Sequence, residues 1–440
     1  MITDINESTL ASIQNPALRA YAAKYVDIYE DFRRQVREMG MEFAEEQHGE
    51  SIQPQVRELG RKGAVVRNDG KSVYSNRISP SCVACQTAIA SHTFFISLKC
   101  HRDCFFCFNP NQENYKQYRE QVRDLAAELD ALHASGQRVQ HLALTGGEPL
   151  LHKDAAVQFF QRARRHFPGS YTRLYTCGDH LDPETLQSLR DAGMNEIRFS
   201  IRLEDTEKAQ ARTYQQIALA REYIPNVMVE MPVLPGSFAA MQQVLLKLDE
   251  LGAFGINLLE LCFPFHNAEE FRKRGYRIKP RPFRVLYNYW YAGGLPVAGS
   301  EETCLDLLEF ALVQKLRLGV HYCSLENKHT GQVYQQNALA RQGKPLYFSQ
   351  RDYFLKSAKV FGEDVVTARN VLDKQGVRAY AVNPEYQGLE FPVNRIKLLR
   401  NAVAEVGISS HVLEDRGGET VLRELKVDVT SPEAFKLSDI

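Results

Sequence analysis

Short apolar segments alternate with longer amphipathic segments between residues 92 and 262, and this alternation limits the possible folds more than any other feature. The apolar segments have the length of buried strands, and the amphipathic segments repeat apolar residues with helical spacing. Such a succession predicts a parallel sheet with right-handed crossovers. We therefore expect an α/β fold whose six strands cover residues 93–98, 139–145, 172–177, 196–203, 227–234 and 255–262.

The chain also has room for flanking domains, because 440 residues exceed what one core usually encloses. We expect an N-terminal extension over residues 1–87, a main domain over 88–325 and a small α+β appendage over 326–440. The extension should hold an amphipathic helix over 16–39, packed on the main domain, and a hairpin around residues 64–74. In the appendage the patterns predict helices over 352–374 and 393–406, a strand over 377–382 and a hairpin across 416–419.

Three cysteines, Cys100, Cys104 and Cys107, follow the first expected strand at a C-x3-C-x2-C spacing. Three thiolates can hold a four-iron cluster at three corners and leave one iron without a protein ligand. Zinc is the competing metal. Structural zinc, however, takes four protein ligands, and only the second gap, C-x2-C, has the usual spacing of a zinc site. Three cysteines that bind no metal are the third alternative. The loop lies where parallel sheets and barrels hold their chemistry, at the C-terminal end of a strand.

A second motif, Gly146-Gly147-Glu148-Pro149, ends the second expected strand. Its glycines allow the backbone to approach a ligand closely. Together, the cysteine loop and this motif resemble the radical S-adenosylmethionine (SAM) superfamily over about residues 90 to 265. The resemblance implies that Cys100, Cys104 and Cys107 bind a [4Fe-4S] cluster, and that the amino and carboxylate groups of SAM bind its open iron. It further implies that Phe106 lies against the adenine and that Gly146, Gly147, Glu148 and Pro149 bind the methionyl amino group.

The resemblance also implies a partial (β/α)6 TIM-like barrel, and strand periodicity indicates which side chains face its lumen. On the fourth strand, alternation directs Arg198, Ser200 and Arg202 inward. Members of the superfamily commonly contact the ribose and carboxylate of SAM from this strand, so Ser200 and Arg202 are candidates; ion pairing within the barrel is the alternative. By the same alternation, Glu230 and Glu260 are expected to face inward, where a carboxylate could hold a ribose hydroxyl or the substrate.

Cys82 and Cys85 form a C-x2-C pair upstream of the cysteine loop. They could supply half of a zinc site or of an auxiliary iron-sulfur cluster, or they could be reduced thiols that only pack. Cys323, on a short seventh strand, could be a further metal ligand, a thiyl-forming or proton-donating thiol, or a buried side chain. Cys323 and Glu260 are the catalytic candidates. Partners for the C-x2-C pair could come from Cys177, Cys262, Cys304, Cys323, His321 or His329.

By resemblance, the activity is reductive cleavage of SAM to a 5′-deoxyadenosyl radical that abstracts hydrogen from a substrate. Residues 266–300 mix cations with aromatic side chains at the expected mouth of the barrel, which favours a ribosomally synthesised peptide as the substrate. A small metabolite or RNA is the enzymatic alternative, and an iron-sulfur binding or sensing protein is the non-catalytic one. The electron donor is expected to be a ferredoxin or flavodoxin. The cations Lys99, His101 and Arg102 could meet this carrier or tune the potential of the cluster, or they could be ordinary solvated charges.

The charge balance gives no general attraction to nucleic acid or to an anionic membrane, because Lys plus Arg and Asp plus Glu both number 54. The chain lacks an apolar stretch of membrane-spanning length, and its first residues lack the basic and apolar regions of a signal peptide. Nine cysteines, several of them crowded before residue 108, fit metal binding in a reducing compartment better than disulfides. We therefore expect a cytoplasmic protein.

Overall fold

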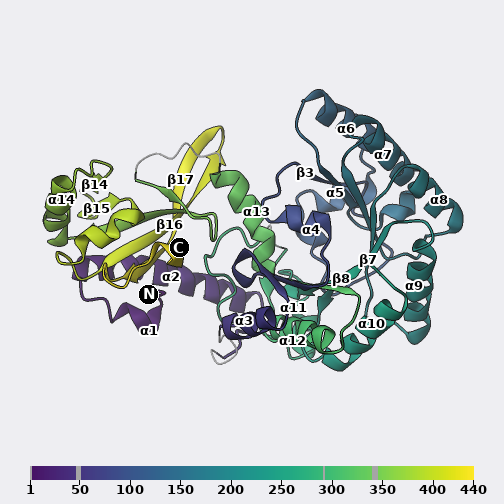
Figure 1. Cartoon of the computed structure of the whole chain (residues 1–440), viewed down its shortest axis with the longest axis horizontal. Helices are drawn as coiled ribbons and strands as arrows, with labels where there is room; N and C mark the ends of the chain where they lie inside the picture. Colours follow the sequence, from purple (N-terminus) through teal and green to yellow (C-terminus); the bar gives the residue numbers. More distant parts are fainter. Residues whose placement is uncertain (1, 46–50, 291–292, 339–344) are drawn as a thin grey trace. The chain divides into compact units, whose positions relative to one another are not determined.

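The computed structural model describes residues 2–45, 51–290, 293–338 and 345–440. The chain forms two compact units (Figure 1). The barrel unit consists of the described residues within 41–282 and 288–331, and the appendage unit consists of those within 2–40, 283–287 and 332–440. The predicted extension over 1–87 is therefore divided between the two units.

The barrel unit is built on a nine-stranded sheet with the order β1-β2-β11-β8-β7-β6-β5-β4-β3. The strands from β11 to β3 are parallel, whereas β2 pairs antiparallel with both β11 and β1. This confirms the predicted α/β fold with a partial parallel barrel and a seventh parallel strand. The bounds are β1 (Val65–Arg67), β2 (Ser72–Ser75), β3 (Ser91–Phe95), β4 (His141–Thr145), β5 (Tyr171–Thr176), β6 (Glu196–Phe199), β7 (Asn226–Val233), β8 (Gly255–Glu260) and β11 (Gly319–Cys323).

Helices between successive parallel strands cover one face of this sheet (Figure 1). Side chains of Asp124, Asp182 and Thr206 accept hydrogen bonds from the first turns of three of these helices, which fixes where they begin. Their apolar sides and the sheet share one core. The helices are α6 (Leu125–Ala134), α7 (Lys153–His166), α8 (Pro183–Asp191), α9 (Glu207–Ala220), α10 (Phe238–Glu250) and α12 (Ser300–Val313).

Shorter elements of the barrel unit complete the surroundings of the sheet. The short helix α4 (Pro80–Cys85) lies against the opposite, concave face of the sheet, which we call the lumen (Figure 1). The other elements are α3 (Gln53–Arg61), α5 (Tyr115–Glu120), β9 (Cys262–Phe263), α11 (Ala268–Lys273), β10 (Leu295–Pro296) and α13 (Leu325–Asn337), whose last residues belong to the appendage unit. Within the described ranges, no helix combines the length and apolar content of a membrane span.

The appendage unit has an antiparallel sheet with the order β14-β15-β13-β16-β17, and β12 pairs with β13. It confirms the predicted α+β class and the hairpin across residues 416–419. Its core includes Ala358, Leu389 and Phe391. The elements are α1 (Glu7–Leu10), α2 (Pro16–Glu38), β12 (Tyr347–Phe348), β13 (Leu355–Phe361), α14 (Asp364–Lys374), β14 (Ala381–Asn383), β15 (Gly388–Phe391), β16 (Val406–Arg416) and β17 (Glu419–Thr430).

Three expectations about these flanking regions are wrong, and the strand expected over 377–382 forms only as the short β14, which begins at Ala381. The helix over 16–39 forms, but α2 packs on β13 and β17 of the appendage unit, where the Tyr21 hydroxyl donates to Glu424 at 2.9 Å. The segment 352–374 is a strand followed by a helix, because nearly every residue of β13 is buried and its pattern shows no strand alternation. The expected helix over 393–406 is a 3-10 helix at Val393–Leu399, after which β16 begins.

Candidate functional site

The cysteine loop, residues 100–107, follows β3 and is held by hydrogen bonds from neighbouring segments. The Cys107 N–H donates to the Cys104 carbonyl at 3.0 Å, which closes a turn between two of the thiols. The His266 ring and the Cys107 carbonyl oxygen lie 2.7 Å apart, and the Asn267 amide donates to the Phe105 carbonyl at 3.2 Å. All three thiols are partly accessible. The loop is therefore fixed mainly through its backbone, and the Cys100 sulfur accepts a backbone hydrogen bond from Arg102 N–H at 3.4 Å.

The spacing of the three sulfurs fits a cluster better than a single ion. Tetrahedral zinc with Zn–S bonds of about 2.3 Å needs sulfurs within about 4 Å of one another. Among the described residues, only His101, Cys177 and Asp179 bring three ligand atoms within 4.8 Å, so the sulfurs of Cys100, Cys104 and Cys107 are spread more widely. In a four-iron cluster each thiolate binds a different iron, which requires such a spread.

Burial keeps the loop thiols protonated when no metal is bound. It raises the pKa of Cys104 to about 11, and it also raises the pKa values of Cys100 and Cys107. A thiolate is the form that binds iron, so loading a cluster must release these protons. The three residues therefore fit the [4Fe-4S] cluster that the sequence predicts.

The glycine motif packs directly against the backbone that enters the cysteine loop. The Gly147 N–H donates to the Ser97 carbonyl at 3.0 Å, and the Glu148 N–H donates to the Lys99 carbonyl at 2.9 Å. A Cβ atom on Gly147 would lie 1.9 Å from the Lys99 carbonyl oxygen, and Gly146 has a φ of +119°. Only glycine fits these two positions, since any side chain would collide with the neighbouring backbone or strain its own.

Glu148 is 2% exposed, and its carboxylate is bound by three protein donors. It accepts hydrogen bonds from Leu150 N–H at 3.0 Å, from the Thr176 hydroxyl at 2.8 Å and from Cys177 N–H at 2.7 Å. Pro149 is buried at the start of a 3-10 helix, Pro149–His152. Glu148 thus joins the end of β4 to the end of β5 beside the cysteine loop.

Phe106 reaches from the cysteine loop to the C-terminal ends of β6 and β7. With residues of the last part of β7 and residues that follow β6 and β7, it lines a small, mostly apolar pocket, which also includes Arg202. The Arg202 guanidinium donates to the Asp103 carbonyl at 3.4 Å, and Ser200 is half-buried just after β6. The lining residues are Phe106, Ile201, Arg202, Leu203, Glu204, Met231, Pro232 and Leu234. Two of the predicted SAM contacts, Phe106 and Arg202, therefore meet in one pocket.

Glu230 faces the lumen as expected, and there it pairs with Arg198. The Arg198 guanidinium lies 2.5 Å from the Glu230 carboxylate and 2.6 Å from that of Glu196, and Asn257 donates to Glu230 at 2.6 Å. Burial by itself would raise the pKa of Glu230, but Arg198 and the Asn257 amide outweigh it and lower that pKa. Glu230 is therefore held as a carboxylate inside the lumen.

Glu260 does not face the lumen, which corrects the expected orientation. Asn257 faces inward on β8, so strand alternation places Glu260 on the helix-covered side. There its carboxylate accepts from Leu325 N–H at 2.7 Å and lies 3.6 Å from the Lys279 ammonium, which also pairs with Glu301. The prediction assigned the inward and outward positions of β8 one residue out of step. Because β8 is buried on both sides, its sequence shows no alternation of polar and apolar residues from which the inward face could be read.

The remaining thiols lie in three different settings. Cys82 and Cys85 lie on α4, Cys323 ends β11, and Asn327 donates to the Cys323 sulfur at 3.3 Å. Cys262 and Cys304 are buried, Cys304 within the core around α12. The rings of His321 and His329 are buried as well.

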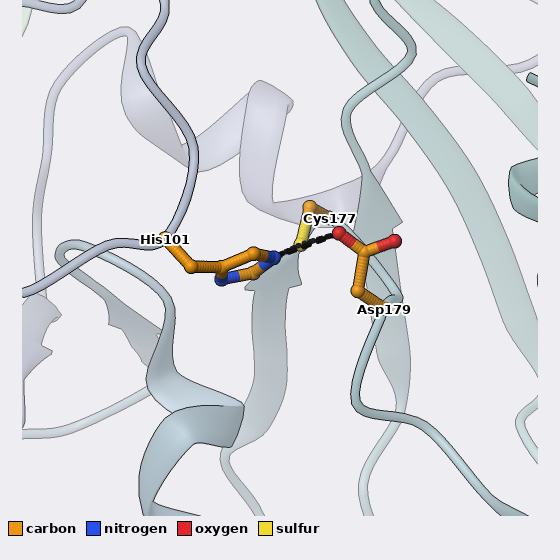
Figure 2. Close-up of side chains that lie close together, drawn as sticks. All are labelled: His101, Cys177 and Asp179. Atoms are coloured by element: carbon orange, nitrogen blue, oxygen red, sulfur yellow. Dashed lines mark hydrogen bonds and ion pairs between the residues drawn. The ribbon is translucent and has the colours of Figure 1, made fainter. Parts of the chain in front are cut away.

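A group of polar and charged residues beside the cysteine loop was not predicted as a unit; Figure 2 shows three of them, His101, Cys177 and Asp179. The Asp179 carboxylate lies 2.8 Å from the His101 ring and accepts from Arg102 Nε at 2.7 Å, while Arg102 also donates to Asp205 at 2.8 Å. The guanidinium already neutralises Asp179, which makes His101, Cys177 and Asp179 an ion-paired anchor rather than a cation site. The position of Asp179 just after β5, at the same sheet edge as the loop, was the available signal.

Comparisons with known proteins agree with this geometry. Residues 94–247 match the family description "Radical SAM superfamily". A protein of Methanocaldococcus jannaschii, named as a candidate glycyl-radical enzyme activating enzyme, is 26% identical over 285 residues, which cover 63% of this chain and 69% of that protein.

Solved structures with partial similarity include two bacterial proteins. SuiB of Streptococcus suis bound to S-adenosylmethionine aligns with a TM-score of 0.41 and 12% identity over 55% of this chain and 52% of SuiB. The radical SAM methyltransferase TsrM of Kitasatospora setae aligns with a TM-score of 0.34 and 19% identity over 45% of this chain and 41% of TsrM. The chain spans about half the length of the solved structures that it matches.

The family match covers the end of β3, the cysteine loop and the glycine motif, which are the parts that form the site. Proteins of this family use a [4Fe-4S] cluster together with SAM, and the three half-buried thiols and the glycine cradle fit that pair. Residues 94–247, the segment that forms this site, are therefore a radical SAM domain.

Proposed function

We propose that this chain cleaves SAM reductively and uses the resulting radical to abstract hydrogen from a protein or peptide substrate. The observation that carries the first part is the cysteine loop with its three spread thiols, packed on the glycine motif through the Gly147 to Ser97 and Glu148 to Lys99 hydrogen bonds. The cluster, when bound by Cys100, Cys104 and Cys107, supplies the electron that breaks the sulfonium bond of SAM.

The protein's own residues bind and orient the cofactor in this proposal. Phe106 and the apolar ends of β6 and β7 offer a surface for the adenine and exclude water from it. Arg202 lies in the same pocket and is close enough to Cys104 to lower the pKa of that thiol against the larger effect of burial. Its guanidinium is thus suited to the SAM carboxylate, while Ser200 and Glu230 are candidates for the ribose. The backbone of Gly146 to Pro149 would receive the methionyl amino group.

An exposed aromatic group beside the cysteine loop supports a protein or peptide substrate. Trp290 is 49% exposed and Phe108 is 45% exposed. The ring centroids of Phe265 and Trp290 lie 4.0 Å apart. Gly293 links Trp290 to Phe108: its N–H donates to the Trp290 carbonyl at 3.0 Å, and a Cβ atom on Gly293 would lie 3.0 Å from the Phe108 ring. Large exposed aromatic side chains are typical anchors of protein interfaces.

The relative from Methanocaldococcus jannaschii favours the same substrate class. Its name assigns it a protein partner, a glycyl-radical enzyme, and the two chains share 26% identity over most of the relative's length. We therefore place polypeptide ahead of small metabolites. Within that class, a ribosomally synthesised peptide and a folded enzyme present the same groups, namely backbone amides and Cα–H bonds.

The electron is proposed to come from an acidic carrier of the ferredoxin or flavodoxin class. Lys99 and His101 are exposed at the cysteine loop, where such a carrier could approach the cluster. If these charges steer the carrier, the rate of reduction should fall as salt rises, since exposed charges are screened beyond about 10 Å at 0.1 M.

Transfer of deuterium into 5′-deoxyadenosine tests the substrate class. The source organism is grown on deuterated medium, its extract is divided into a macromolecular and a small-metabolite fraction, and each is incubated anaerobically with reconstituted enzyme, SAM and dithionite. The proposal predicts deuterated 5′-deoxyadenosine with the macromolecular fraction, and loss of that signal after the fraction is digested to single amino acids. Deuterium transfer from the small-metabolite fraction alone would refute the polypeptide substrate.

A further inference from the structure

We propose that Cys82, Cys85 and Cys323 form a second iron-sulfur site on the lumen side of the barrel, separate from the cysteine loop. The first two thiols come from α4, and the third comes from the end of β11, more than two hundred residues later in the chain. Their convergence is a property of the fold and was not fixed by the sequence spacing.

The position of Cys82 is defined by the lumen residues around it. The Arg198 guanidinium donates to the Cys82 sulfur at 3.3 Å and to the Ser79 hydroxyl at 3.0 Å. The Asn257 amide donates to the same sulfur at 3.3 Å. Cys85 lies three residues further along α4, so the two thiols share one side of the helix, with their Cβ atoms about 5–6 Å apart. α4 therefore holds Cys82 beside Asn257 of β8, with Cys85 on the same side of the helix.

Cys323 reaches the same place from β11. His321 is the register partner of Asn257 in the parallel pair of β11 and β8, and their side chains are joined at 2.9 Å. Alternation puts Cys323 on the same face as His321, one step nearer the C-terminal end. Asn257 thus links Cys82 to the strand that carries Cys323.

Packing of α13 brings the far end of α4 to Cys323. The helix begins at Leu325, directly after the strand, and a Cβ atom on Gly331 would lie 2.7 Å from the Cys85 carbonyl oxygen. The Asn327 amide of α13 donates to the Cys323 sulfur at 3.3 Å, and Gly331 follows one turn later on the same side of this helix. Cys85 is exposed and the other two thiols are half-buried, so the site is open to an incoming ligand.

The donor set favours iron-sulfur over zinc. In the part of the chain that the structure describes, these three sulfurs, like those of the cysteine loop, do not all lie within 4.8 Å of one another. A single zinc ion needs its sulfur ligands within about 4 Å of one another. A histidine that could complete a zinc site is occupied, because His321 contacts Asn257 through Nδ1 and Ser72 through Nε2, both at 2.9 Å. Three thiolates without a fourth ligand suit a [4Fe-4S] cluster with one open iron facing the lumen.

Metal content of paired cysteine variants of the full chain tests the site. Each protein is reconstituted anaerobically with iron and sulfide, and iron, sulfide and zinc are counted beside the electron paramagnetic resonance spectrum of the dithionite-reduced sample. We expect about eight irons in the wild type, about four after the triple change Cys100→Ala, Cys104→Ala and Cys107→Ala, and about four after Cys82→Ala, Cys85→Ala and Cys323→Ala.

A single change, Cys323→Ser, made in the first triple variant should remove the remaining iron, whereas Cys262→Ala in that background should leave it in place. Cys262 is a buried thiol of β9 outside the proposed site, and circular dichroism of each variant establishes that it is folded. About four irons in the wild type and none in the first triple variant would overturn the proposal, as would zinc without iron or a Cys82–Cys85 disulfide that resists dithiothreitol. The iron retained by the first triple variant does not depend on SAM cleavage, so failure of the proposed function and failure of this site are distinguishable.

Discussion

The Cα of Gly147 lies so close to Lys99 that a Cβ atom there would be 1.9 Å from the Lys99 carbonyl oxygen. The end of β4 is thereby pressed against the chain that leads from β3 into the cysteine loop. The two segments are joined by the Gly147 and Glu148 amides, which donate to the carbonyls of Ser97 and Lys99. Two motifs that lie about forty residues apart in the sequence thus form one rigid support, and the position of the thiols depends on it.

Gly147→Ala should therefore displace the cysteine loop. Overpacking of this kind typically costs about 1–3 kcal/mol, so we expect a loss of that size in the free energy of unfolding and weaker retention of iron. Denaturant titration and iron counts on the reconstituted protein measure both effects. Gly169→Ala is the matched control, because a Cβ atom at Gly169 meets nothing within 4 Å. Equal stability and iron content in the two variants would contradict the close approach.

Glu148→Gln should destabilise the barrel unit although the side chain keeps its shape. The carboxylate accepts hydrogen bonds from Leu150 N–H, the Thr176 hydroxyl and Cys177 N–H. In glutamine an NH2 group replaces one of the two oxygens, and this NH2 group cannot accept a hydrogen bond. Hydrogen bonds to a buried charge contribute about 1.5–3 kcal/mol, and we expect a loss in that range by denaturant titration. The same change at exposed Glu120 should have almost no effect; a similarly small effect at Glu148 would show that its bonds are not needed.

Glu260 should make stability depend on pH in a defined window. Burial, with the Glu301 carboxylate adding to it against the opposing Lys279, raises the pKa of Glu260 from 4.5 to about 7. A raised carboxyl pKa means that the folded state holds a proton that the unfolded state has lost. The contribution of neutral Glu260 to the free energy of unfolding is complete below pH 4.5. It declines as the pH rises and is gone above about pH 7, and its total is on the order of 3 kcal/mol.

The measurement is the free energy of unfolding of the wild type and of Glu260→Gln across this window. The variant cannot titrate at this position, so the difference between the two proteins should change steadily from pH 4.5 to pH 7 and then stay constant. Parallel curves would mean that Glu260 has an ordinary pKa in the folded protein.

Trp290→Ala and Phe108→Ala should weaken binding of a polypeptide substrate without changing SAM cleavage in its absence. Aromatic anchors of interfaces often contribute about 2 kcal/mol or more, which corresponds to a roughly thirtyfold increase in KM. The test compares KM for substrate with the rate of uncoupled 5′-deoxyadenosine formation. Phe238→Ala, a change at an exposed aromatic residue of α10, is the control. An unchanged KM in both variants would exclude the aromatic group as a docking surface.

Much of the barrel could be predicted from the sequence because its strands and helices follow simple periods. Asp182 and the adjacent Pro183 correctly predicted the start of α8, and alternation on β6 and β7 correctly directed Arg198 and Glu230 into the lumen. The same reasoning misplaced Glu260, because β8 is buried on both sides and its register could not be read from polarity. β13 was missed for the same reason, since burial on both sides removes the alternation that distinguishes a strand.

The contacts between distant segments could not be predicted. The sequence offered six possible partners for Cys82 and Cys85, and no spacing rule separates Cys323 from the others. The proposal of Cys323 rests on the register between β8 and β11, which places His321 beside Asn257, and on the packing of α13 against α4. The anchor formed by Asp179, His101 and Arg102 likewise arises only when the ends of β3 and β5 meet at one edge of the sheet.

Formation of 5′-deoxyadenosine in an anaerobic mixture of reconstituted protein, SAM and dithionite tests the central claim most directly. We predict that the wild type and Cys262→Ala produce it together with methionine, and that Cys100→Ala, Cys104→Ala and Cys107→Ala each abolish it. Absence of 5′-deoxyadenosine from wild-type protein that carries its full complement of iron, or its undiminished formation by the three loop variants, would contradict the account.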